Sequence, residues 1–547
     1  MQTTSNQEGK TLTRAEKVVT WFLPNPGDII FFLVLAFLLL VKPSFVFADG
    51  STGWHLATGN YILAHGLPST DLMSYTFPHK PWVPYEWLSD VIGAVLIKIG
   101  GGQLNLLGVL VSATCGAVMI LLYERARKEG ANTLLAFFLV LCATIVSAIH
   151  WLARPHIFTF LGVILYSCWL EDFWSGKLSA KALWLRLSLL MILWLNLHPG
   201  FQVGLIQIGI YVACAGAAWL LRLNKESAAR LKGLLIGLGL CCIATLFNPY
   251  GIGLHRYLVG YRGNTAFAEV TNEFLSPIFH GALQPDCLEI LIAFLIAGIG
   301  ISKKRLSMPR LLTCIAFLHL ALYAVRHMPL FALMAIPATA RLFSSISLSD
   351  LGFVGGEKKY WWQGIYDRLR KFDEEFSENE RICNKHLISI LCVFVLSIAA
   401  VNGGSLFGTK MLACNWDDDH LPTTAIQALH EAEKSGQLDP NRGFNFDNWG
   451  GYINFALDQR VLIDDRAEFY GRPFYERYCA AFFGSNWKPM LDGALFEKTE
   501  VAGSSVQWLL VPRASNIASI LSSQAGWEEI STKDKVGALF VRREPKK

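Results

Sequence analysis

Charged residues are scarce in this chain. Of its 547 residues, 17% are charged and 53% are hydrophobic, whereas soluble globular proteins carry about 25% charged residues. The apolar residues form long uninterrupted runs, which excludes disordered, collagenous and small disulfide-stapled chains. The net charge of +5 is too small to indicate binding to nucleic acid. These observations predict a polytopic membrane protein instead of the three or four soluble domains that length alone suggests.

The chain also lacks the short motifs of several large enzyme classes. It has no GxxxxGK[ST] phosphate-binding loop, no HExxH zinc motif and no GxSxG nucleophile turn. CxxC and His-rich spacings are missing too, so no residue is assigned as a metal ligand. Internal repeats and low-complexity tracts are absent from the sequence. Any chemistry must therefore come from residues dispersed along the chain.

Most of the twelve cysteines lie within apolar runs, where a thiol behaves as a small buried hydrophobic side chain. Only Cys414 and Cys479 lie in the polar C-terminal part, and they could form a disulfide bond in an oxidising compartment. The first apolar run starts near Asp28 without a small-residue cleavage site, so we expect no cleavable signal peptide.

Apolar runs long enough to cross a bilayer, which takes roughly 20 residues per helix, recur along the chain. The sequence predicts about eleven spans, at residues 28–47, 103–123, 133–150, 157–171, 183–197, 201–221, 233–247, 288–302, 311–326, 328–346 and 387–403. The runs on either side of 198–200 and of 326–327 leave almost no loop, which predicts tight helical hairpins.

Lysine and arginine alternate between the loops. One set of loops is rich in them: Lys10, Arg14, Lys17, Arg125, Arg127, Lys128, Lys177, Lys181, Arg186, Arg222, Lys225, Arg230, Lys232, Lys303, Lys304, Arg305 and Arg310. The other set holds only Lys80, Lys98, Arg154, Arg256, Arg262 and Arg326. Cytoplasmic loops carry the excess of these residues, so the N-terminus is predicted inside and the last 140 or so residues outside.

Two segments are amphipathic without being membrane spans. Counting 86–99 as a span would reverse every later loop against the charge rule, so we interpret it as a helix on the outer surface. Segment 357–381 has an apolar stripe among many charges and is interpreted as an interfacial connector on the inner side. The stripe consists of Trp361, Trp362, Ile365, Leu369, Phe372 and Phe376.

The C-terminal part has an ordinary, charged composition. Helix-like stretches at 423–434, 474–483 and 514–523 alternate with strand-like runs at 460–463, 506–511 and 538–542, which predicts a small α/β domain. The predicted organisation is a cytoplasmic segment 1–27, a transmembrane core 28–346 with a first outer loop 48–102, a connector 347–386, a last span 387–403 and an extracytoplasmic domain 410–547.

Carboxylates of the first outer loop are candidate catalytic groups. Asp49 directly follows the first span, and Asp71 and Glu86 come later in the same loop. A carboxylate here could act as general base on an acceptor hydroxyl or amine, or it could hold a divalent cation, which prefers oxygen ligands. Asp49 could equally cap or solvate a helix end.

Arginines and histidines stand out in the outer loops, which otherwise avoid positive charge. The candidates are Arg154, His156, His198, Arg262, Arg326 and His327. Arginine binds phosphate bidentately, so their convergence at one membrane face would hold an anionic, lipid-linked phosphate. Taken singly, each could be a loop residue or a side chain that reaches the interface.

Several short motifs together resemble a known family. They are Thr52-Gly53-Trp54-His55-Leu56-Ala57-Thr58-Gly59, Ser69-Thr70-Asp71, Glu86-Trp87-Leu88, Arg154-Pro155-His156, Asn196-Leu197-His198-Pro199-Gly200, Asn248-Pro249-Tyr250-Gly251, Arg326-His327-Met328-Pro329-Leu330, Asn448-Trp449-Gly450-Gly451-Tyr452 and Ile463-Asp464-Asp465-Arg466-Ala467-Glu468. In order and spacing, over nearly the whole chain, they resemble bacterial GT-C type membrane glycosyltransferases, and most closely an uncharacterised branch with a C-terminal extracytoplasmic domain.

The resemblance implies a GT-C-like fold in the bacterial inner membrane and a polyprenyl-phosphate-linked sugar as donor. It implies that an acidic residue of the first loop is the catalytic base, which by position is Asp49, and it marks Trp54 and His55 as a first-loop motif. Relatives often carry an acidic residue directly before this motif, where this chain has Ser51. If Asp49 does not substitute for it, Asp71 and Glu86 are the next candidates.

The leading hypothesis is therefore a glycosyltransferase that works among membrane lipids and moves a sugar to an extracytoplasmic glycan, lipid or protein. One alternative is a transporter or flippase of a lipid-linked or anionic solute, which would favour paired charges at mid-membrane depth. Another is a non-catalytic scaffold for surface-polymer assembly, for which a single span would suffice. No cofactor is assigned beyond the open case of a divalent cation.

Overall fold

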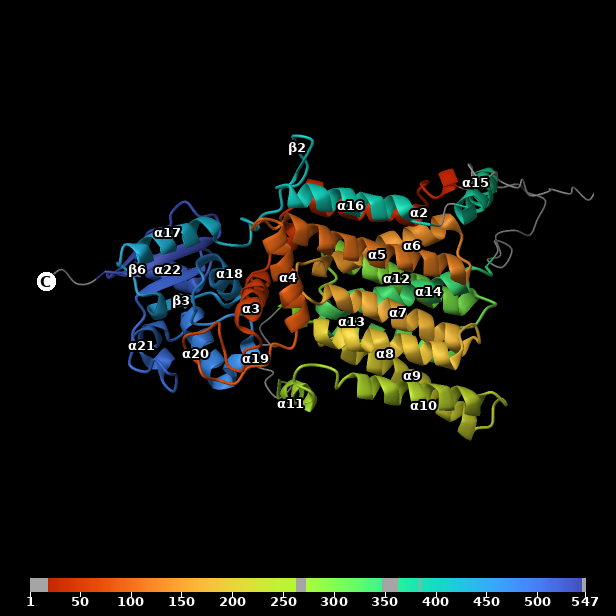
Figure 1. The fold of residues 1–547 in the computed structure, drawn as a ribbon, viewed down its shortest axis with the longest axis horizontal. Coiled ribbons are helices and arrows are strands. Elements are labelled where there is room, and N and C mark those ends of the chain that lie inside the picture. The colour runs from red at the N-terminus through yellow and green to blue at the C-terminus, as the bar shows by residue number, and fades with distance from the viewer. Residues whose placement is uncertain (1–17, 262–271, 347–362, 383–384, 544–547) are drawn as a thin grey trace, which may run out of the picture.

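A computed structural model describes residues 18–261, 272–346, 363–382 and 385–543. Most of them form long helices that run side by side in one bundle, and a smaller domain of helices and strands lies at one end of it (Figure 1). The chain is a polytopic helical membrane protein with a small C-terminal α/β domain, as the sequence predicts.

Each of the eleven predicted spans contains an apolar helix. These helices are α2 (Pro26–Ala36), α5 (Asn105–Glu129), α6 (Thr133–Ser147), α7 (Ile157–Trp174), α8 (Ala180–Leu197), α9 (Phe201–Leu220), α10 (Ser227–Ala244), α12 (Leu283–Ile301), α13 (Met308–Tyr323), α14 (Met328–Phe343) and α16 (Leu387–Val401). Among the described residues, seven are long and apolar enough to cross a membrane, and three shorter ones accompany them. The eleventh, α14, is buried along nearly its whole length, so it lies at the centre of the bundle.

Local sequence sets several helix ends. Asn25 and Asp28 form a capping box at the start of α2, and Ser307 caps α13, which satisfies backbone N–H groups that have no partner within the helix. Both predicted hairpins are present. Only residues 198–200 separate α8 from α9, and a short 3-10 turn, Val325–His327, leads directly into α14.

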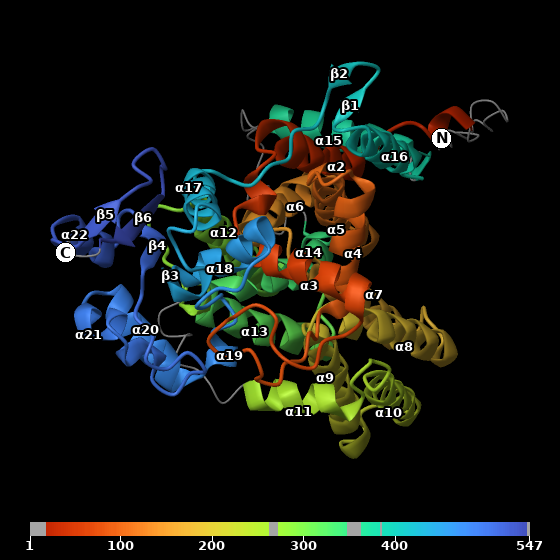
Figure 2. The same cartoon turned by 60° about the vertical axis from the view of Figure 1, so that its left-hand side comes forward.

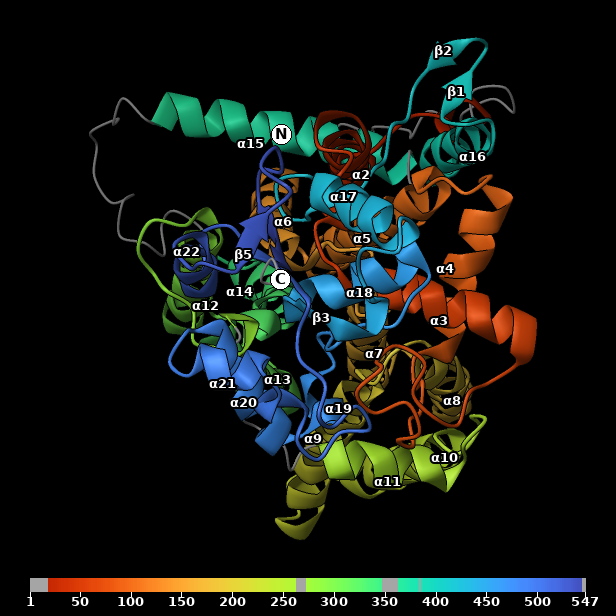
Figure 3. The same ribbon diagram turned by 90° about the vertical axis from the view of Figure 1, so that its left-hand side faces the viewer.

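The first outer loop folds into two helices that lie across one end of the bundle (Figure 3). One is α4 (Trp87–Ile99), the predicted amphipathic helix. The other, α3 (Ser51–His65), was not predicted, because its first half buries small and polar residues against protein and so shows no apolar stripe. Another short helix, α11 (Ile252–Tyr261), also lies at this end.

The amphipathic connector lies at the opposite end of the bundle, where it forms α15 (Gln363–Ile382) (Figure 1). Of its predicted stripe, Trp361 and Trp362 lie outside the described residues. Ile365, Leu369 and Phe372 are about half exposed, as expected of side chains that face a membrane interface.

The C-terminal domain is built on a four-stranded sheet of order β3-β4-β6-β5, in which only β3 and β4 are parallel. Its strands are β3 (Gly443–Asn445), β4 (Trp508–Pro512), β5 (Trp527–Glu529) and β6 (Gly537–Arg542). Its helices are α17 (Thr423–Lys434), α18 (Asp447–Leu457), α19 (Ala467–Tyr470), α20 (Arg472–Phe482), α21 (Trp487–Leu491) and α22 (Asn516–Ser522). A small hairpin, β1 (Ser405–Leu406) and β2 (Thr409–Lys410), precedes the domain.

The domain's predicted elements are mostly confirmed. The helix at 423–434 is present as α17, and β4 and β6 lie within two residues of the predicted strands. The strand predicted at 460–463 is wrong. Its backbone bonds the first outer loop in a single bridge, from Tyr75 N–H to the Val461 carbonyl and from Val461 N–H to the Met73 carbonyl, and no ladder continues from there.

Cys414 and Cys479 are both free thiols and form no disulfide bond. Cys414 packs beside Gly108 of α5, at the side of the bundle, whereas Cys479 is on α20 within the domain. The two cysteines therefore belong to different packing environments.

Candidate functional site

A pocket of about 460 Å³ lies between the end of the bundle and the C-terminal domain. The bundle and its loops contribute Asp49, Ser51, Trp54, Tyr85, Glu86, Arg154, His198, Pro199, Glu273, Phe274 and Arg326. The domain contributes Phe446, Asp447, Asn448, Asp465, Arg466, Ala467, Glu468, Tyr475, Tyr478, Cys479, Phe482 and Phe483. The loop motifs and the domain motifs recognised in the sequence thus meet at one place.

Glycines bring the first loop and the domain into backbone contact, with α3 lying against α18 (Figure 2). A Cβ on Gly50 would lie 1.9 Å from the Asn448 carbonyl oxygen, and one on Gly53 would lie 2.1 Å from that of Gly451. Any larger residue would separate the two helices, since real Cβ atoms do not approach so closely. Two of the sequence motifs therefore serve to dock the domain onto the bundle.

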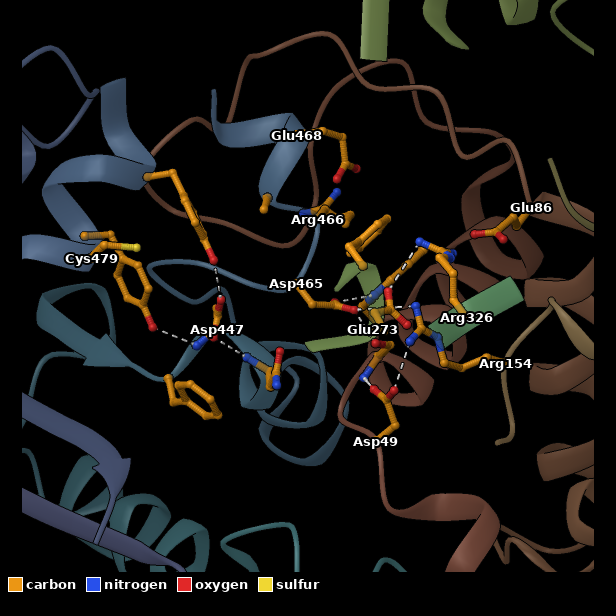
Figure 4. A pocket seen from close by; sticks show the side chains of 18 of the residues that line it. Asp49, Glu86, Arg154, Glu273, Arg326, Asp447, Asp465, Arg466, Glu468 and Cys479 are labelled. Atoms are coloured by element: carbon orange, nitrogen blue, oxygen red, sulfur yellow. Dashed lines mark hydrogen bonds and ion pairs between the residues drawn. The ribbon is translucent and has the colours of Figure 1, made fainter. Parts of the chain in front are cut away.

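Two aspartates face the guanidinium of Arg154, one from the first loop and one from the domain (Figure 4). Its Nη1 donates to Asp49 Oδ2 at 2.9 Å, and its Nη2 lies 3.9 Å from Asp465 Oδ2. Asp465 also accepts hydrogen bonds from the Ser51 hydroxyl and from Trp54 Nε1. Ser51 thus binds a carboxylate that comes from the domain.

The two aspartates differ in basicity. Burial disfavours the charge on Asp49, but Arg154 and hydrogen bonds from Ser51 outweigh it and hold the pKa of Asp49 below its usual value. Burial, together with the nearby Asp49 charge, raises the pKa of Asp465 to about 7 against the pull of Arg154. Of the pair, Asp465 is therefore the stronger base near neutral pH.

The loop that carries Arg154 is held by the start of α3. The Thr52 hydroxyl donates to the Ala153 carbonyl at 3.1 Å, and Ala153 N–H donates to the Val46 carbonyl at 2.7 Å. Both bonds fix the backbone next to Arg154, so the guanidinium is presented by a rigid support.

His198 and Glu86 meet on the bundle side of the pocket. His198 Nδ1 accepts a hydrogen bond from Gly200 N–H at 2.9 Å, so the proton of the neutral ring is on Nε2, which lies 3.5 Å from Glu86 Oε1. Burial and nearby cations lower the pKa of His198 well below its usual value, while burial raises the pKa of Glu86 to about 8. His198 therefore presents an N–H donor to the pocket.

Arg326 enters the pocket from the turn before α14. Its Nη1 lies 3.4 Å from Glu273 Oε1, and its guanidinium packs 4.4 Å from the ring centre of Phe274. Among the described residues this is the one ion pair of Arg326, and it is loose, so they leave most of the guanidinium's donor groups available to a ligand.

Asp71 has a different environment from the other two first-loop candidates. It is buried, and its carboxylate accepts from Arg466 Nη2 at 2.8 Å and from Ser74 N–H at 2.8 Å. Arg466 in turn pairs with Asp464 and packs on the ring of Trp82. Asp71 thus ties the first loop to the domain and does not line the pocket.

The remaining predicted residues are distributed as follows. His156 Nε2 lies 2.6 Å from the His150 carbonyl and His327 Nδ1 3.3 Å from the Leu320 carbonyl, and neither lines the pocket. His55 Nδ1 lies 2.6 Å from Asp90 Oδ1, so it belongs to the contact between α3 and α4. Arg262 lies outside the described residues.

The residues that sequence reasoning did not assign come chiefly from the domain. Asp465, Arg466 and Glu468 belong to the motif at 463–468, to which the sequence alone assigns no role. Asp447 directly precedes the motif at 448–452. Their signal in the sequence is a charged run directly after the apolar stretch 461–463. Because about 400 residues separate them from the first outer loop, their contacts with that loop could not be predicted from the sequence.

The acidic residues of the pocket surround an arginine. The described residues include no group of three His, Cys, Asp or Glu side chains arranged to hold a metal ion. Asp49 and Asp465 instead both face the Arg154 guanidinium, at 2.9 Å and 3.9 Å. These carboxylates are thus arranged around an arginine.

No family model and no curated protein sequence matches this chain. The fold does match solved structures. The crystal structure of the Archaeoglobus fulgidus oligosaccharyltransferase in the apo form is 13% identical, with a TM-score of 0.52 over 91% of this chain and 70% of that one.

A second match is the A. fulgidus oligosaccharyltransferase AglB in complex with an inhibitory peptide and a dolichol-phosphate. It is also 13% identical, with a TM-score of 0.52 over 94% of this chain and 73% of that one. A sequence identity this low shows similarity of the fold alone. This chain shares the fold of these two solved oligosaccharyltransferase structures.

Proposed function

We propose that this protein is a membrane glycosyltransferase that moves a sugar from a polyprenyl-phosphate donor to an extracytoplasmic acceptor. The observation that carries the proposal is the convergence of Arg154, Arg326 and His198 with Asp49 and Asp465 in one pocket at the end of the bundle. A structural neighbour was solved with a dolichol-phosphate, which supports a lipid-linked phosphate as the donor class.

The cationic side of the pocket suits the leaving phosphate. Arg154 and Arg326 come from two separate loops, and His198 adds the N–H of its Nε2. Because donors fixed before the reaction need no reorganisation, they stabilise the charge that develops on the phosphate as its bond to the sugar breaks. Arg262, His156 and His327 remain outside this proposal.

Asp465 is the better placed base, and Asp49 holds Arg154 in position. Asp465 would take the proton from the acceptor hydroxyl as its oxygen attacks the anomeric carbon. The bond from that carbon to the phosphate oxygen breaks, and the electron pair leaves with the lipid phosphate. One displacement of this kind inverts the anomeric carbon. Asp49, the base implied by the resemblance, instead fixes the arginine through its ion pair.

We place the protein in the bacterial inner membrane, with its N-terminus cytoplasmic and its C-terminal domain extracytoplasmic. Loops rich in lysine and arginine indicate the cytoplasmic side. The connector α15 and the C-terminal domain lie at opposite ends of the bundle (Figure 1), which supports this topology. A lipid-linked donor would then reach the pocket from the outer leaflet.

The alternatives are less well supported. A transporter places its substrate near the bilayer midplane between two repeats, whereas this pocket lies at one end of the bundle and is completed by the domain. A scaffold needs no pocket in which two arginines and several carboxylates face one another. Neither alternative is favoured by a specific contact.

The test is mass spectrometry of surface glycans and lipid-linked sugars in cells that carry the protein, lack it, or carry the R154A/R326A variant. We expect the deletion and the variant to lose one glycan and to accumulate its lipid-linked donor. R256A, which removes an exposed arginine of α11 that does not line the pocket, is the matched control. Unchanged glycans in the deletion strain would refute the proposal.

A further inference from the structure

The pocket has two sides of different chemistry. Arg154, Arg326, His198, Asp49 and Glu86 lie on the bundle side. Asp447 and Cys479 lie on the far side of Asp465, within the domain (Figure 4). We call this far side the aromatic arm, and it is formed by Phe446, Asp447, Asn448, Tyr475, Tyr478, Cys479, Phe482 and Phe483.

Three rings of the aromatic arm are stacked in parallel. Phe446 stacks on Phe482 with ring centres 5.2 Å apart and an angle of 18°, and Phe482 stacks on Tyr478 at 6.0 Å and 17°. Tyr478 continues onto the buried Phe444 at 5.2 Å and 16°. The stack is anchored in the domain core at Phe444, so its open end is a rigid apolar surface.

The open end of the stack carries exposed aromatic area. Beside it, Phe483 meets Phe482 edge-to-face, with ring centres 5.3 Å apart and an angle of 79°. Phe483 is 52% exposed and Phe446 and Phe482 are half-buried, although all three line a pocket. Apolar rings that line a pocket and stay accessible favour a ligand with its own apolar face.

One carboxylate faces the same space. Asp447 Oδ2 accepts from the Tyr475 hydroxyl at 3.2 Å, and its Oδ1 accepts from Asn448 N–H at 2.9 Å. Burial raises the pKa of Asp447 to about 6, so near neutral pH it is still an acceptor. No cationic side chain of the described residues lines this arm, which disfavours an anionic ligand.

A peptide bound by strand addition has no edge to pair with here. The outer side of β3 is already occupied by the protein's own chain, because the Tyr75 hydroxyl donates to the Gly443 carbonyl and the Asn445 side chain bonds the Ile463 carbonyl and Leu462 N–H. Main-chain pairing gives that mode of recognition its affinity, so the arm lacks its main requirement.

We propose that the aromatic arm binds the acceptor as an uncharged saccharide, with one sugar ring packed on Phe483, the most exposed ring of the arm, beside Phe446 and Phe482, and with a hydroxyl bonded to Asp447. A pyranose has an apolar C–H face and hydroxyl groups at its edge, which matches a ring stack beside a carboxylate. Its role as acceptor rests on the proposed transferase function, since Asp465 lies between the arm and the arginines (Figure 4).

Saturation-transfer NMR on the full-length protein in nanodiscs tests the binding directly. The probes are methyl glycosides of glucose, mannose, galactose and N-acetylglucosamine, their disaccharides, and an uncharged capped pentapeptide. We expect at least one saccharide to receive saturation on one ring face. The signal should fall at least fivefold in F483A and in D447N. F407A, which removes a 98% exposed ring of the hairpin, should leave it unchanged.

The inference would be overturned if only the peptide, or no probe at all, received saturation. It would also be overturned if F483A and D447N both left the saccharide signal intact. Because F483A changes an exposed side chain, loss of folding cannot explain its effect. The R154A/R326A variant should retain saccharide binding. A protein that binds the saccharide but transfers nothing would contradict the transferase function alone, and one that transfers sugar without this binding would contradict the inference alone.

Discussion

Buried charges gather at both ends of the helical bundle, and the two clusters differ. At the end away from the domain, Arg310 bonds Glu129 at 2.7 Å, and Arg125 bonds Glu129 at 2.8 Å and Asp172 at 2.7 Å. The carboxylates there face arginines at close range. The outer pocket is lined by six acidic residues and only three arginines, around an open volume. A balanced cluster holds helices together, whereas an unbalanced one around a cavity indicates a binding site.

The largest effect should come from the base of the outer pocket. D465N should reduce transfer by about 10²- to 10⁴-fold without loss of folding, since asparagine can still accept from Ser51 and Trp54. D49N is the matched variant. It should weaken donor binding because Arg154 loses its close partner. Kinetics with purified variants separate the two roles, and a D465N protein with normal kcat would assign the base elsewhere.

The inner cluster should respond in stability and not in chemistry. R310A removes a buried partner of Glu129 and leaves its charge less compensated, so we expect a loss of about 3–5 kcal/mol in the free energy of unfolding. Transfer per folded molecule should stay close to normal. Denaturant unfolding and activity of the folded fraction measure both. An R310A protein that is fully stable but inactive would show that the inner cluster serves the chemistry and not the stability.

The sequence predicts the bundle better than the site, for a physical reason. Spans such as Ile157–Trp174 follow from local hydropathy, and α4 follows from its apolar face. The helix α3 was not predicted, because the glycines at its start, Gly50 and Gly53, are there to allow close contact with α18, and this contact leaves no local pattern in the sequence. The strand predicted at 460–463 failed because its backbone partner is Tyr75, a pairing that no local pattern reveals.

The candidate site residues, too, could be predicted where the signal is local and could not where it depends on a distant contact. Asp49, Glu86, Arg154, His198 and Arg326 line the pocket, and charge in a loop that otherwise avoids it was enough to single them out. Asp71 looked equivalent in sequence, yet it pairs with Arg466 from the domain. The role of Asp465 could not be predicted, because its environment is created by a contact across 414 residues with Ser51.

The pH dependence of transfer distinguishes Asp465 from Asp49 as the base. The pKa of Asp465 is raised by burial to about 7, so its basic form is lost as the pH falls through that value. Transfer should then decline about tenfold per pH unit below about 7. Were Asp49 the base, its lowered pKa would keep the rate flat well below pH 5. Measuring kcat/KM between pH 5 and 9 distinguishes the two aspartates.

The smallest effect concerns the stability of the outer pocket. Burial raises the pKa of Glu86 from 4.5 to about 8, so the folded protein holds this proton more tightly than the unfolded chain. The resulting stability is complete below about pH 4.5 and is lost as the pH rises through 8. E86Q should therefore gain about 2 °C in Tm over the parent at pH 9 but not at pH 5. Thermal unfolding at both pH values is the measurement, and an equal difference at both would contradict the assignment.

Binding of a polyprenyl phosphate to the purified protein tests the central claim most directly. Native mass spectrometry can count the bound lipid phosphate in the parent protein, in R154A/R326A and in R310A. The account predicts one bound lipid phosphate in the parent and in R310A, and a loss of at least tenfold in affinity in R154A/R326A. Equal binding by all three proteins would contradict the account, because the outer arginines would then not hold the donor.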